Sequence, residues 1–262
     1  MLWRRFKADM KKYLRYSIIS AKSQLKSEIA NSYLNWFWWI LDPVCFMLIY
    51  TFMFGYVFKA REAYFPIFIF IGLSMWDFFN RMMNTGVKIV KDNKAIVTKV
   101  YLPKYILIMT KLWNNGFKMM ISFGIVFAMM LVWRVPITLN LLWFFPILMI
   151  LGIFTFGCAA HLAHYGVFVE DLSNVISICL RLIFYMTGIF YNVETRIPAP
   201  YGEMLTKGNP MAFLLQSMRG AMLYGKTPHR KLLLFWLLVS LMLAWTGIRK
   251  IYKNENSYVK VI

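Results

Sequence analysis

Acidic residues are scarce in this sequence. Its 262 residues include 11 Asp and Glu against 30 Lys and Arg, a formal net charge of +19. In a soluble protein this excess would suggest a nucleic-acid partner. In an apolar chain the positions of the basic residues matter more, because cytoplasmic loops of membrane proteins are rich in Lys and Arg. We therefore expect membrane lipids, and no nucleic acid, among the partners.

Cysteine and histidine are also rare, which argues against a metal or catalytic site. Cys45, Cys158 and Cys179 lie inside apolar runs with no C-x-x-C spacing, so we expect them to be buried small hydrophobes. His161 and His164 have no acidic or cysteine partner at helical spacing. A metal pair is conceivable there, but helix packing is the better interpretation. We predict no catalytic residue, no metal and no cofactor in this chain.

Long apolar runs make up most of the sequence. Hydrophobic residues make up 60% of the chain and the mean hydropathy is +0.55, well above the apolar share of about 45–50% in soluble domains. A helical crossing of a bilayer needs about 20 residues. The sequence thus predicts an all-α polytopic membrane protein with six transmembrane helices, near Trp36–Phe58, Phe65–Met83, Ile106–Trp133, Leu141–Tyr165, Val175–Tyr191 and Leu232–Ile251.

Basic residues predict the side that each connection faces. Lys and Arg are concentrated before the first span, between Lys88 and Lys104, and after the last span. We therefore place both termini and this connection in the cytoplasm. The single predicted domain, 1–262, divides into a cytoplasmic segment 1–34, five spans in 36–191, an outer loop 192–231, a last span 232–252 and a tail 253–262. The six basic residues of the outer loop fit the charge rule poorly.

The segment before the first span is too polar to cross a membrane. Apolar residues such as Phe6 and Met10 recur every three to four positions, with Arg and Lys between them. This pattern predicts an amphipathic helix in the cytoplasmic headgroup layer. A solvated basic arm is the alternative.

One short stretch, GAMLYGKT from Gly220 to Thr227, satisfies the phosphate-loop pattern G-x-x-x-x-G-K-[ST]. That loop binds phosphate only between a buried strand and the start of a helix. Here helix formers precede the motif, and Pro228 disfavours a helical conformation at Thr227. We interpret the stretch as a turn after a helix, with Gly225 as a left-handed cap. Any ATP would then be bound by another chain.

Four charged residues lie inside the predicted spans: Asp42, Asp77, Arg81 and Arg181. An ionisable group at membrane depth is costly and usually faces protein or water. Asp77 and Arg81 are four residues apart on one helix, which favours a structural ion pair. Arg181 has no such partner, so it either meets an anionic group or extends to the inner interface.

Four stretches follow one another along nearly the whole chain: NSYLNWFWWILDPVCFMLIYTFMFG, FIFIGLSMWDFFNRMMNTGVKIVKDNKAIVTKVYLPK, VFVEDLSNV and NPMAFLLQSMRGAMLYG. Their order resembles type-2 ABC exporter permeases that move polysaccharides, O-antigens and teichoic acids. One departure is Glu170-Asp171, where that family usually has Arg-Asp. The resemblance implies six spans, an N-terminal interfacial helix, and two short re-entrant helices between Ala199 and Tyr224.

The resemblance also implies the partners. It implies a separate nucleotide-binding ATPase that binds ATP and Mg²⁺, a lipid-linked glycan substrate, and a place in the bacterial cytoplasmic membrane. Independently, one six-helix chain without an internal repeat has little room to enclose a wide path, so a two-fold homodimer is expected. Type-2 export of drugs or lipids, and a membrane-embedded enzyme or channel, are the alternative functions.

Aromatic side chains are the predicted lining of the substrate conduit, because sugar rings rest their C–H faces on aromatic rings. One stripe along the first span, with further residues on the fifth, carries this prediction, and packing against lipid or helices is the alternative. The candidate conduit residues are Trp36, Trp39, Phe46, Tyr50, Phe54, Arg181, Phe184, Tyr185 and Tyr191, with Phe190 beside them.

The stretch KDNKAIVTKVYLPK is the predicted site of coupling to the ATPase. It mixes lysines with apolar residues and ends at Pro103, just before the third span. Such a short amphipathic element suits a groove on another protein, although anionic lipid is an alternative partner. The candidate coupling residues are Lys94, Ile96, Val97, Lys99, Val100 and Leu102.

Overall fold

A computed structural model describes residues 2–30, 35–57, 59 and 62–261. Every regular element in these residues is a helix, which confirms the all-α prediction. The elements are α1 (Leu2–Ala30), η1 (Asn35–Phe37), α2 (Trp38–Tyr50), η2 (Thr51–Val57), α3 (Phe65–Asp92), α4 (Lys94–Lys99), α5 (Lys104–Val132), η3 (Leu139–Trp143), α6 (Phe144–Phe168), α7 (Leu172–Met186), α8 (Val193–Arg196), α9 (Tyr201–Gly208), α10 (Pro210–Leu223) and α11 (Arg230–Val261).

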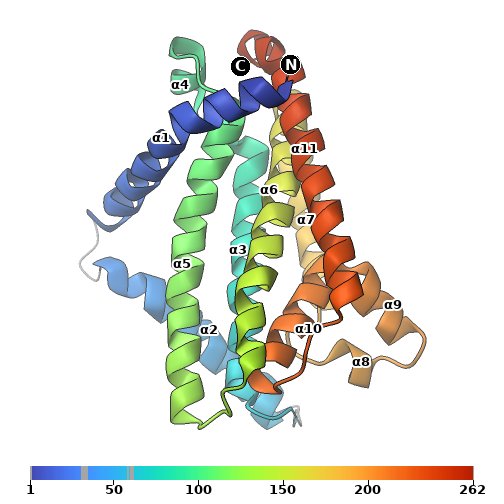
Figure 1. The fold of residues 1–262 in the computed structure, drawn as a ribbon. Coiled ribbons are helices and arrows are strands. Elements are labelled where there is room, and N and C mark those ends of the chain that lie inside the picture. The colour runs from blue at the N-terminus through green and yellow to red at the C-terminus, as the bar shows by residue number, and fades with distance from the viewer. Residues whose placement is uncertain (1, 31–34, 58, 60–61, 262) are drawn as a thin grey trace.

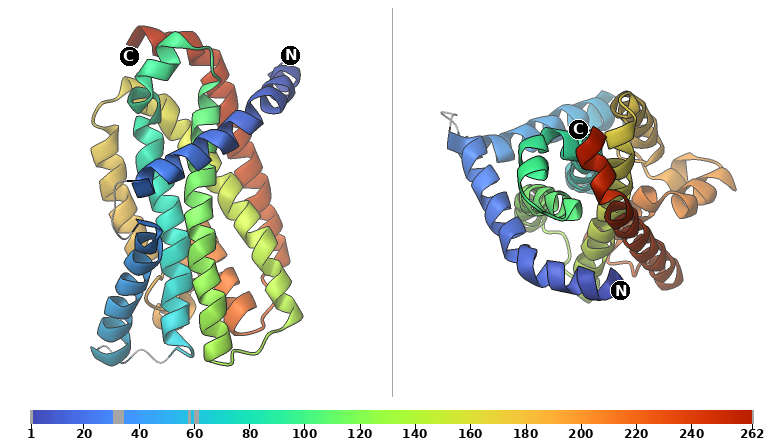
Figure 2. Two further views of the ribbon diagram at one scale, coloured as in Figure 1. Left: turned by 90° about the vertical axis from the view of Figure 1, so that its left-hand side faces the viewer. Right: turned by 90° about the horizontal axis from the view of Figure 1, so that it is seen from above.

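The long helices form one bundle with two distinct ends. α1 begins and α11 ends near α4 at one end, whereas α8, α9 and the α5–α6 connection lie toward the other (Figures 1 and 2). Together with the basic residues of these segments, this arrangement agrees with an even number of crossings. It places the predicted cytoplasmic segments at a common end.

Each of the six predicted spans corresponds to a helix. Among the described residues, four helical stretches are both long and apolar enough to cross a membrane: Trp38–Val57, Lys104–Val132, Leu139–Phe168 and Arg230–Tyr258. α3 has the length but carries several charges toward its C-terminal end. α7 has 15 residues, short of the roughly 20 that a straight crossing needs.

Three helices end at residues other than the limits of the predicted spans. α3 continues past Met83 because Gly86, Ile89 and Val90 are buried in the bundle. α7 ends at Met186, before Gly188 adopts a φ of 70° that a right-handed helix does not allow. The predicted tail 253–262 is helical through Val261, because Tyr258 is fully buried against the bundle.

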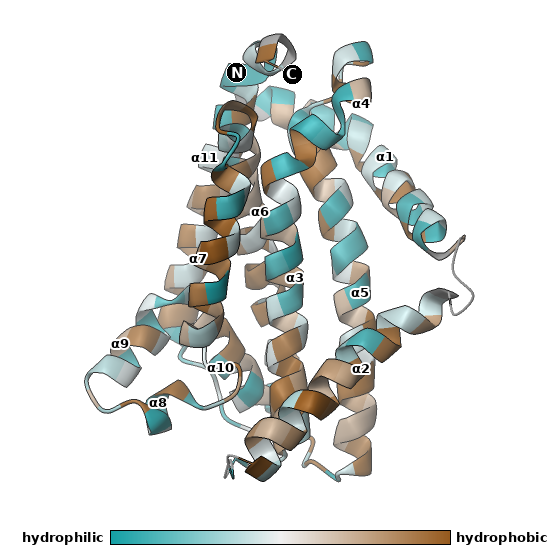
Figure 3. Cartoon of the chain, turned by 180° about the vertical axis from the view of Figure 1, so that it is seen from behind, coloured by the Kyte–Doolittle hydropathy of each residue, from teal (hydrophilic) through white to brown (hydrophobic). Residues whose placement is uncertain are grey.

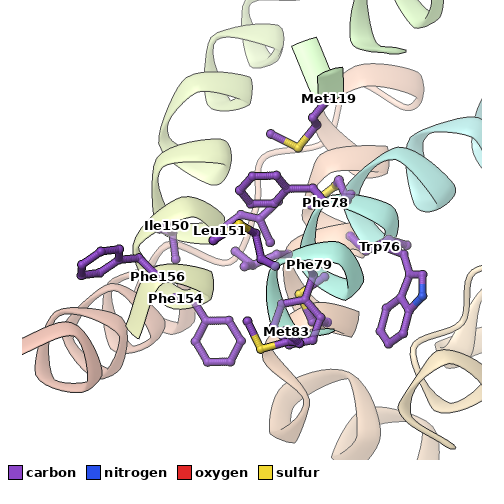
Figure 4. Close-up of a cluster of buried hydrophobic side chains, with 14 of the residues drawn as sticks. Trp76, Phe78, Phe79, Met83, Met119, Ile150, Leu151, Phe154 and Phe156 are labelled. Atoms are coloured by element: carbon purple, nitrogen blue, oxygen red, sulfur yellow. The ribbon is translucent and has the colours of Figure 1, made fainter. Parts of the chain in front are cut away.

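α3 is the centre of the bundle. It packs against α2, α5, α6, α7 and α10, and its first half is buried on every side, with Ile67 through Ile71 at most 1% exposed. Farther along, Phe78, Phe79 and Met83 lie beside Leu151 and Phe154 of α6 (Figure 4). The rings of Phe79 and Phe154 stack at 5.9 Å. Aromatic packing against α6 thus holds α3, the helix that carries Asp77 and Arg81, in place.

Small residues let α6 approach its neighbours closely. A Cβ on Gly166 would lie 2.0 Å from the carbonyl oxygen of Val87 in α3, and one on Gly157 would lie 2.8 Å from the backbone nitrogen of Ala244 in α11. Small residues allow such close helix contacts in membranes, where burial of apolar surface gives little driving force.

α1 is a helix across the bundle end, as Figure 2 shows from above. Its Phe6, Met10 and Tyr13 pack against the core, and Ser17 and Ala21 are buried. Part of its apolar face is thus covered by the chain itself. Residues 31–34, the end of the predicted interfacial segment, lie outside the described residues.

The cysteines correct one prediction. Cys45 and Cys179 are exposed and Cys158 is half-buried. The prediction of buried residues equated an apolar run with a protein-covered side chain. In a membrane protein an apolar helix face also suits a lipid or a second subunit.

Candidate functional site

The phosphate-loop look-alike lies in the structural context that the sequence predicts. α10 precedes it, and Gly225 has a φ of 60°, the left-handed value expected of a cap. The Lys226 N–H donates to the Gly220 carbonyl at 2.8 Å, so it does not point to an open cradle. The next helix begins at Arg230, after Pro228. The interpretation as a turn is confirmed.

Arg219, the residue of α10 that directly precedes this stretch, is a structural residue that the sequence analysis did not select as a site. Its side chain is 2% exposed and lies 3.4 Å from the centre of the Phe68 ring. It donates to the carbonyls of Phe68 at 3.0 Å, Gly188 at 2.8 Å and Ile189 at 2.7 Å. This one guanidinium joins α10 to α3 and to the turn after α7.

Gly72 leaves space for the Arg219 side chain, and Asn209 caps the helix that carries it. A Cβ on Gly72 would lie 2.6 Å from Nη2 of Arg219, so glycine leaves the necessary space. Asn209 begins α10 as its N-cap, with Oδ1 accepting from the N–H groups of Met211 and Ala212. The available signal in the sequence was a lone arginine within an apolar helix.

The predicted aromatic stripe divides into two parts. Its lower part is a packed cluster: the ring of Phe190 lies 4.7 Å from Tyr50, 4.4 Å from Phe54 and 5.3 Å from Phe184. Trp76 extends the cluster, 5.4 Å from Phe184. The structure thus brings together aromatic candidates from the first and fifth predicted spans.

The upper part of the stripe has different neighbours. Trp39 packs edge-on against Phe117 of α5 at 6.1 Å, whereas Trp36 and Phe46 are exposed. α2 crosses from α5 toward the Phe190 turn along its length. Different neighbours therefore cover different parts of the stripe.

Arg181 and Tyr185 border a hollow of about 330 Å³ between α3 and α7. Trp76, Asn80 and Ser177 also line it. Tyr191 lies close by, with its hydroxyl donating to the Tyr185 carbonyl at 2.8 Å. A cation, an amide, a hydroxyl and aromatic rings thus border one hollow.

Three of the four charged residues of the spans, Asp42, Asp77 and Arg81, meet in a second hollow of about 320 Å³ between α2, α3 and α5. Arg81 lies 3.7 Å from Asp77, which confirms the predicted pair, and 3.5 Å from Asp42 of α2. Lys118 of α5 pairs with Glu28 of α1 in the same hollow. These ion pairs neutralise most of the charge of the residues that line the hollow.

The candidate coupling segment forms α4 and the turn that follows it. Val97 and Leu102 are buried and hold it on the bundle, whereas Ile96 and Val100 are exposed beside Lys94 and Lys99. The surface that a partner can reach is therefore narrower than the sequence pattern predicts.

α1 and α11 are tied to this segment. Arg5 of α1 donates to the Tyr101 hydroxyl and to Glu255 of α11, and these hydrogen bonds raise the pKa of the Arg5 guanidinium. The Tyr252 hydroxyl donates to Asp9 at 2.6 Å. The two terminal helices and the coupling segment thus form one connected unit.

The histidines of α6 have partners in α11. His161 lies 3.0 Å from the Thr246 hydroxyl and His164 lies 2.8 Å from the Tyr258 hydroxyl. These contacts account for both rings as parts of the helix packing.

The comparisons with known proteins agree with this architecture. Residues 18–223 match the family described as ABC-2 type transporter. The chain belongs to this family. It is 26% identical over 239 residues to the O-antigen export system permease protein RfbA of Myxococcus xanthus, covering 91% of this chain and 92% of that protein.

Two proteins of the same name from Klebsiella pneumoniae are also similar. One is 23% identical across 79% of this chain and 80% of its own length, and the other is 22% identical across 94% of both. The resemblance to type-2 exporter permeases is therefore confirmed, and the chain is a transport subunit of the membrane.

Proposed function

We propose that this protein is the membrane-spanning subunit of an exporter that moves a lipid-linked polysaccharide across the bacterial cytoplasmic membrane. The observation that carries the proposal is the end-to-end similarity to O-antigen export permeases, over 91% of this chain and 92% of the Myxococcus xanthus protein. Six spans, with both termini in the cytoplasm, are the proposed topology. The helix ends and basic segments described above support it.

A second copy completes the proposed conduit. α2 is strongly apolar, yet Met47 is the one buried residue among those described in it. Most of α7 is also exposed, and Figure 3 shows hydrophobic residues along both helices. A two-fold dimer through these faces would cover them and bring two sets of the aromatic residues and Arg181 together.

A separate ATPase supplies the energy in this proposal, with ATP and Mg²⁺ bound on that subunit. Ile96 and Val100 are the apolar contacts proposed for it, with Lys94 and Lys99 at the rim. Replacing Ile96 and Val100 with Asp should abolish co-purification of the ATPase while the permease stays inserted. Replacing the buried Val97 would instead disturb the bundle. Normal co-purification of the double variant would rule out this coupling surface.

The function is tested by reconstitution of the permease and its ATPase in proteoliposomes. We expect ATP-dependent movement of a lipid-linked glycan to the far side, detected with a lectin that cannot enter. Movement of drugs or phospholipids in its place would favour the alternative type-2 function.

Lys226→Ala should leave ATP hydrolysis by the complex nearly unchanged, because the turn that contains it binds no nucleotide.

A further inference from the structure

A polar pocket lies at the end of the molecule opposite the termini (Figure 1), apart from the two hollows between the long helices. Its volume is about 450 Å³, and residues of the approach to α3, of α8, α9 and α10, and of the turn before α11 line it. This volume is in the range of small-ligand sites. We refer to it as the outer pocket.

The outer pocket is lined mainly by neutral polar groups and aromatic rings. Asn192 and Gln216 contribute amides, Thr195 and Ser217 contribute hydroxyls, and Phe213 and Tyr224 contribute rings. The amides are held in place, because Gln216 Nε2 donates to Asn192 Oδ1 at 3.0 Å and the same oxygen caps α8 through the Glu194 N–H. The Tyr224 hydroxyl oxygen is buried and has no hydrogen-bond partner in the described part of the chain. A buried hydroxyl without a partner is unfavourable until a ligand or water completes it.

The surrounding charges argue against an anionic ligand, although Lys226 and Thr227 of the phosphate-loop look-alike line the pocket. The backbone N–H of Lys226 donates to the Gly220 carbonyl, and the Arg219 guanidinium donates to three carbonyls. Glu62 and Glu194 also line the pocket and would repel a phosphate. The described lining is thus balanced in charge and offers no converging set of N–H donors.

We infer that the outer pocket binds an uncharged sugar unit of the exported polymer. Amides and hydroxyls match sugar hydroxyls, and the aromatic rings match the C–H face of a pyranose. The inference rests on the proposed function and deepens it, because it assigns the substrate to neutral glycans rather than phosphate-linked polymers. A sugar held here, at the predicted outer end, would oppose backward movement of the chain during export.

Tyr224→Phe is the decisive variant. It removes only the hydroxyl that has no partner, so the thermal stability of the permease should not fall. Binding of methyl glycosides of neutral hexoses, measured by saturation-transfer NMR on the permease–ATPase complex in nanodiscs, should weaken about three- to tenfold, the effect of one lost hydrogen bond. Gln216→Leu should weaken binding at least as much. Tyr201→Phe is the matched control, because Tyr201 is an exposed residue of α9 outside the pocket.

The outcomes separate the pocket from the proposed function. The inference is overturned if the wild-type complex binds no hexose glycoside, if Tyr224→Phe binds as the wild type does, or if glycerol phosphate competes better than the glycosides. Each result can occur while the wild-type complex still exports glycan in proteoliposomes. Absence of export would sink the proposed function, and the binding assay would still decide the pocket.

Discussion

α3 and α2 are neighbouring helices, and the helix with more charged residues is the more deeply buried of the two. α3 carries Asp77, Arg81 and three further charges, yet most of its residues are buried. α2 carries a single charge, and it remains largely exposed. Hydrophobicity in a membrane chain therefore marks which residues can leave water, and not which residues the protein covers. How far a helix is covered by protein depends on its position in the bundle and on the small residues that let neighbouring helices approach it.

The largest expected effect comes from the guanidinium that fixes the start of α3. Arg219→Leu removes the guanidinium that donates to three buried carbonyls, and we expect a loss of about 3–5 kcal/mol in the free energy of unfolding. Reversible unfolding in mixed micelles would measure it. Arg181→Leu, on the exposed face of α7, is the control and should change stability by about 0.5 kcal/mol or less. Equal effects of the two variants would contradict the structural role of Arg219.

Next in size is the close contact between α3 and α6. Gly166→Ala places a Cβ against the Val87 carbonyl, where there is no space, so we expect a loss of about 1–3 kcal/mol. Gly152→Ala on the same helix is the matched control, because no atom lies within 4 Å of its added Cβ. That variant should be neutral or slightly stabilising. A neutral Gly166→Ala would show that α6 can move away from α3.

Substitutions at the junction of α2 and η2 should separate stability from assembly. Ile49 of α2 and Phe52 of η2 are 56% and 60% exposed, so the double Ala variant should leave the stability of the single chain nearly unchanged. Self-association should weaken about tenfold or more, equivalent to about 1.4 kcal/mol, measured by dilution in nanodiscs or detergent. The pair Leu238→Ala and Met242→Ala on the exposed face of α11 is the control. Unchanged association of the Ile49 and Phe52 variant would place the dimer interface elsewhere.

The smallest effect is expected at the exposed end of α9. Lys207 donates to Glu203 at 2.7 Å, one turn apart, in full contact with solvent. The bond lowers the pKa of the Glu203 carboxyl, so any stabilisation is present at neutral pH and is lost as the pH falls through that lowered pKa. Lys207→Ala should leave the melting temperature within experimental error at pH 7 and at pH 3. A measurable change would show that α9 is covered in the assembled transporter.

The sequence by itself determined the helical class, the approximate position of each long helix and the turn at Gly225. Apolar run length, charge distribution and the residues around Pro228 carry this information locally, since each depends only on neighbours along the chain. The pair of Asp77 and Arg81 was predictable for the same reason, because one helical turn separates them.

Tertiary structure decided which apolar faces are covered, and sequence periodicity could not supply this. Arg219 is a structural residue only because the carbonyls of Phe68, Gly188 and Ile189 converge on it from distant parts of the chain. Tyr50 joins an aromatic cluster while Phe46, one turn away, stays exposed, because α2 changes neighbours along its length. The outer pocket likewise exists only where segments more than 160 residues apart, Glu62 and the turn before α11, come together. Whether a side chain is buried depends on which helices pack beside it. In a membrane protein, lipid can cover an apolar face in place of a neighbouring helix.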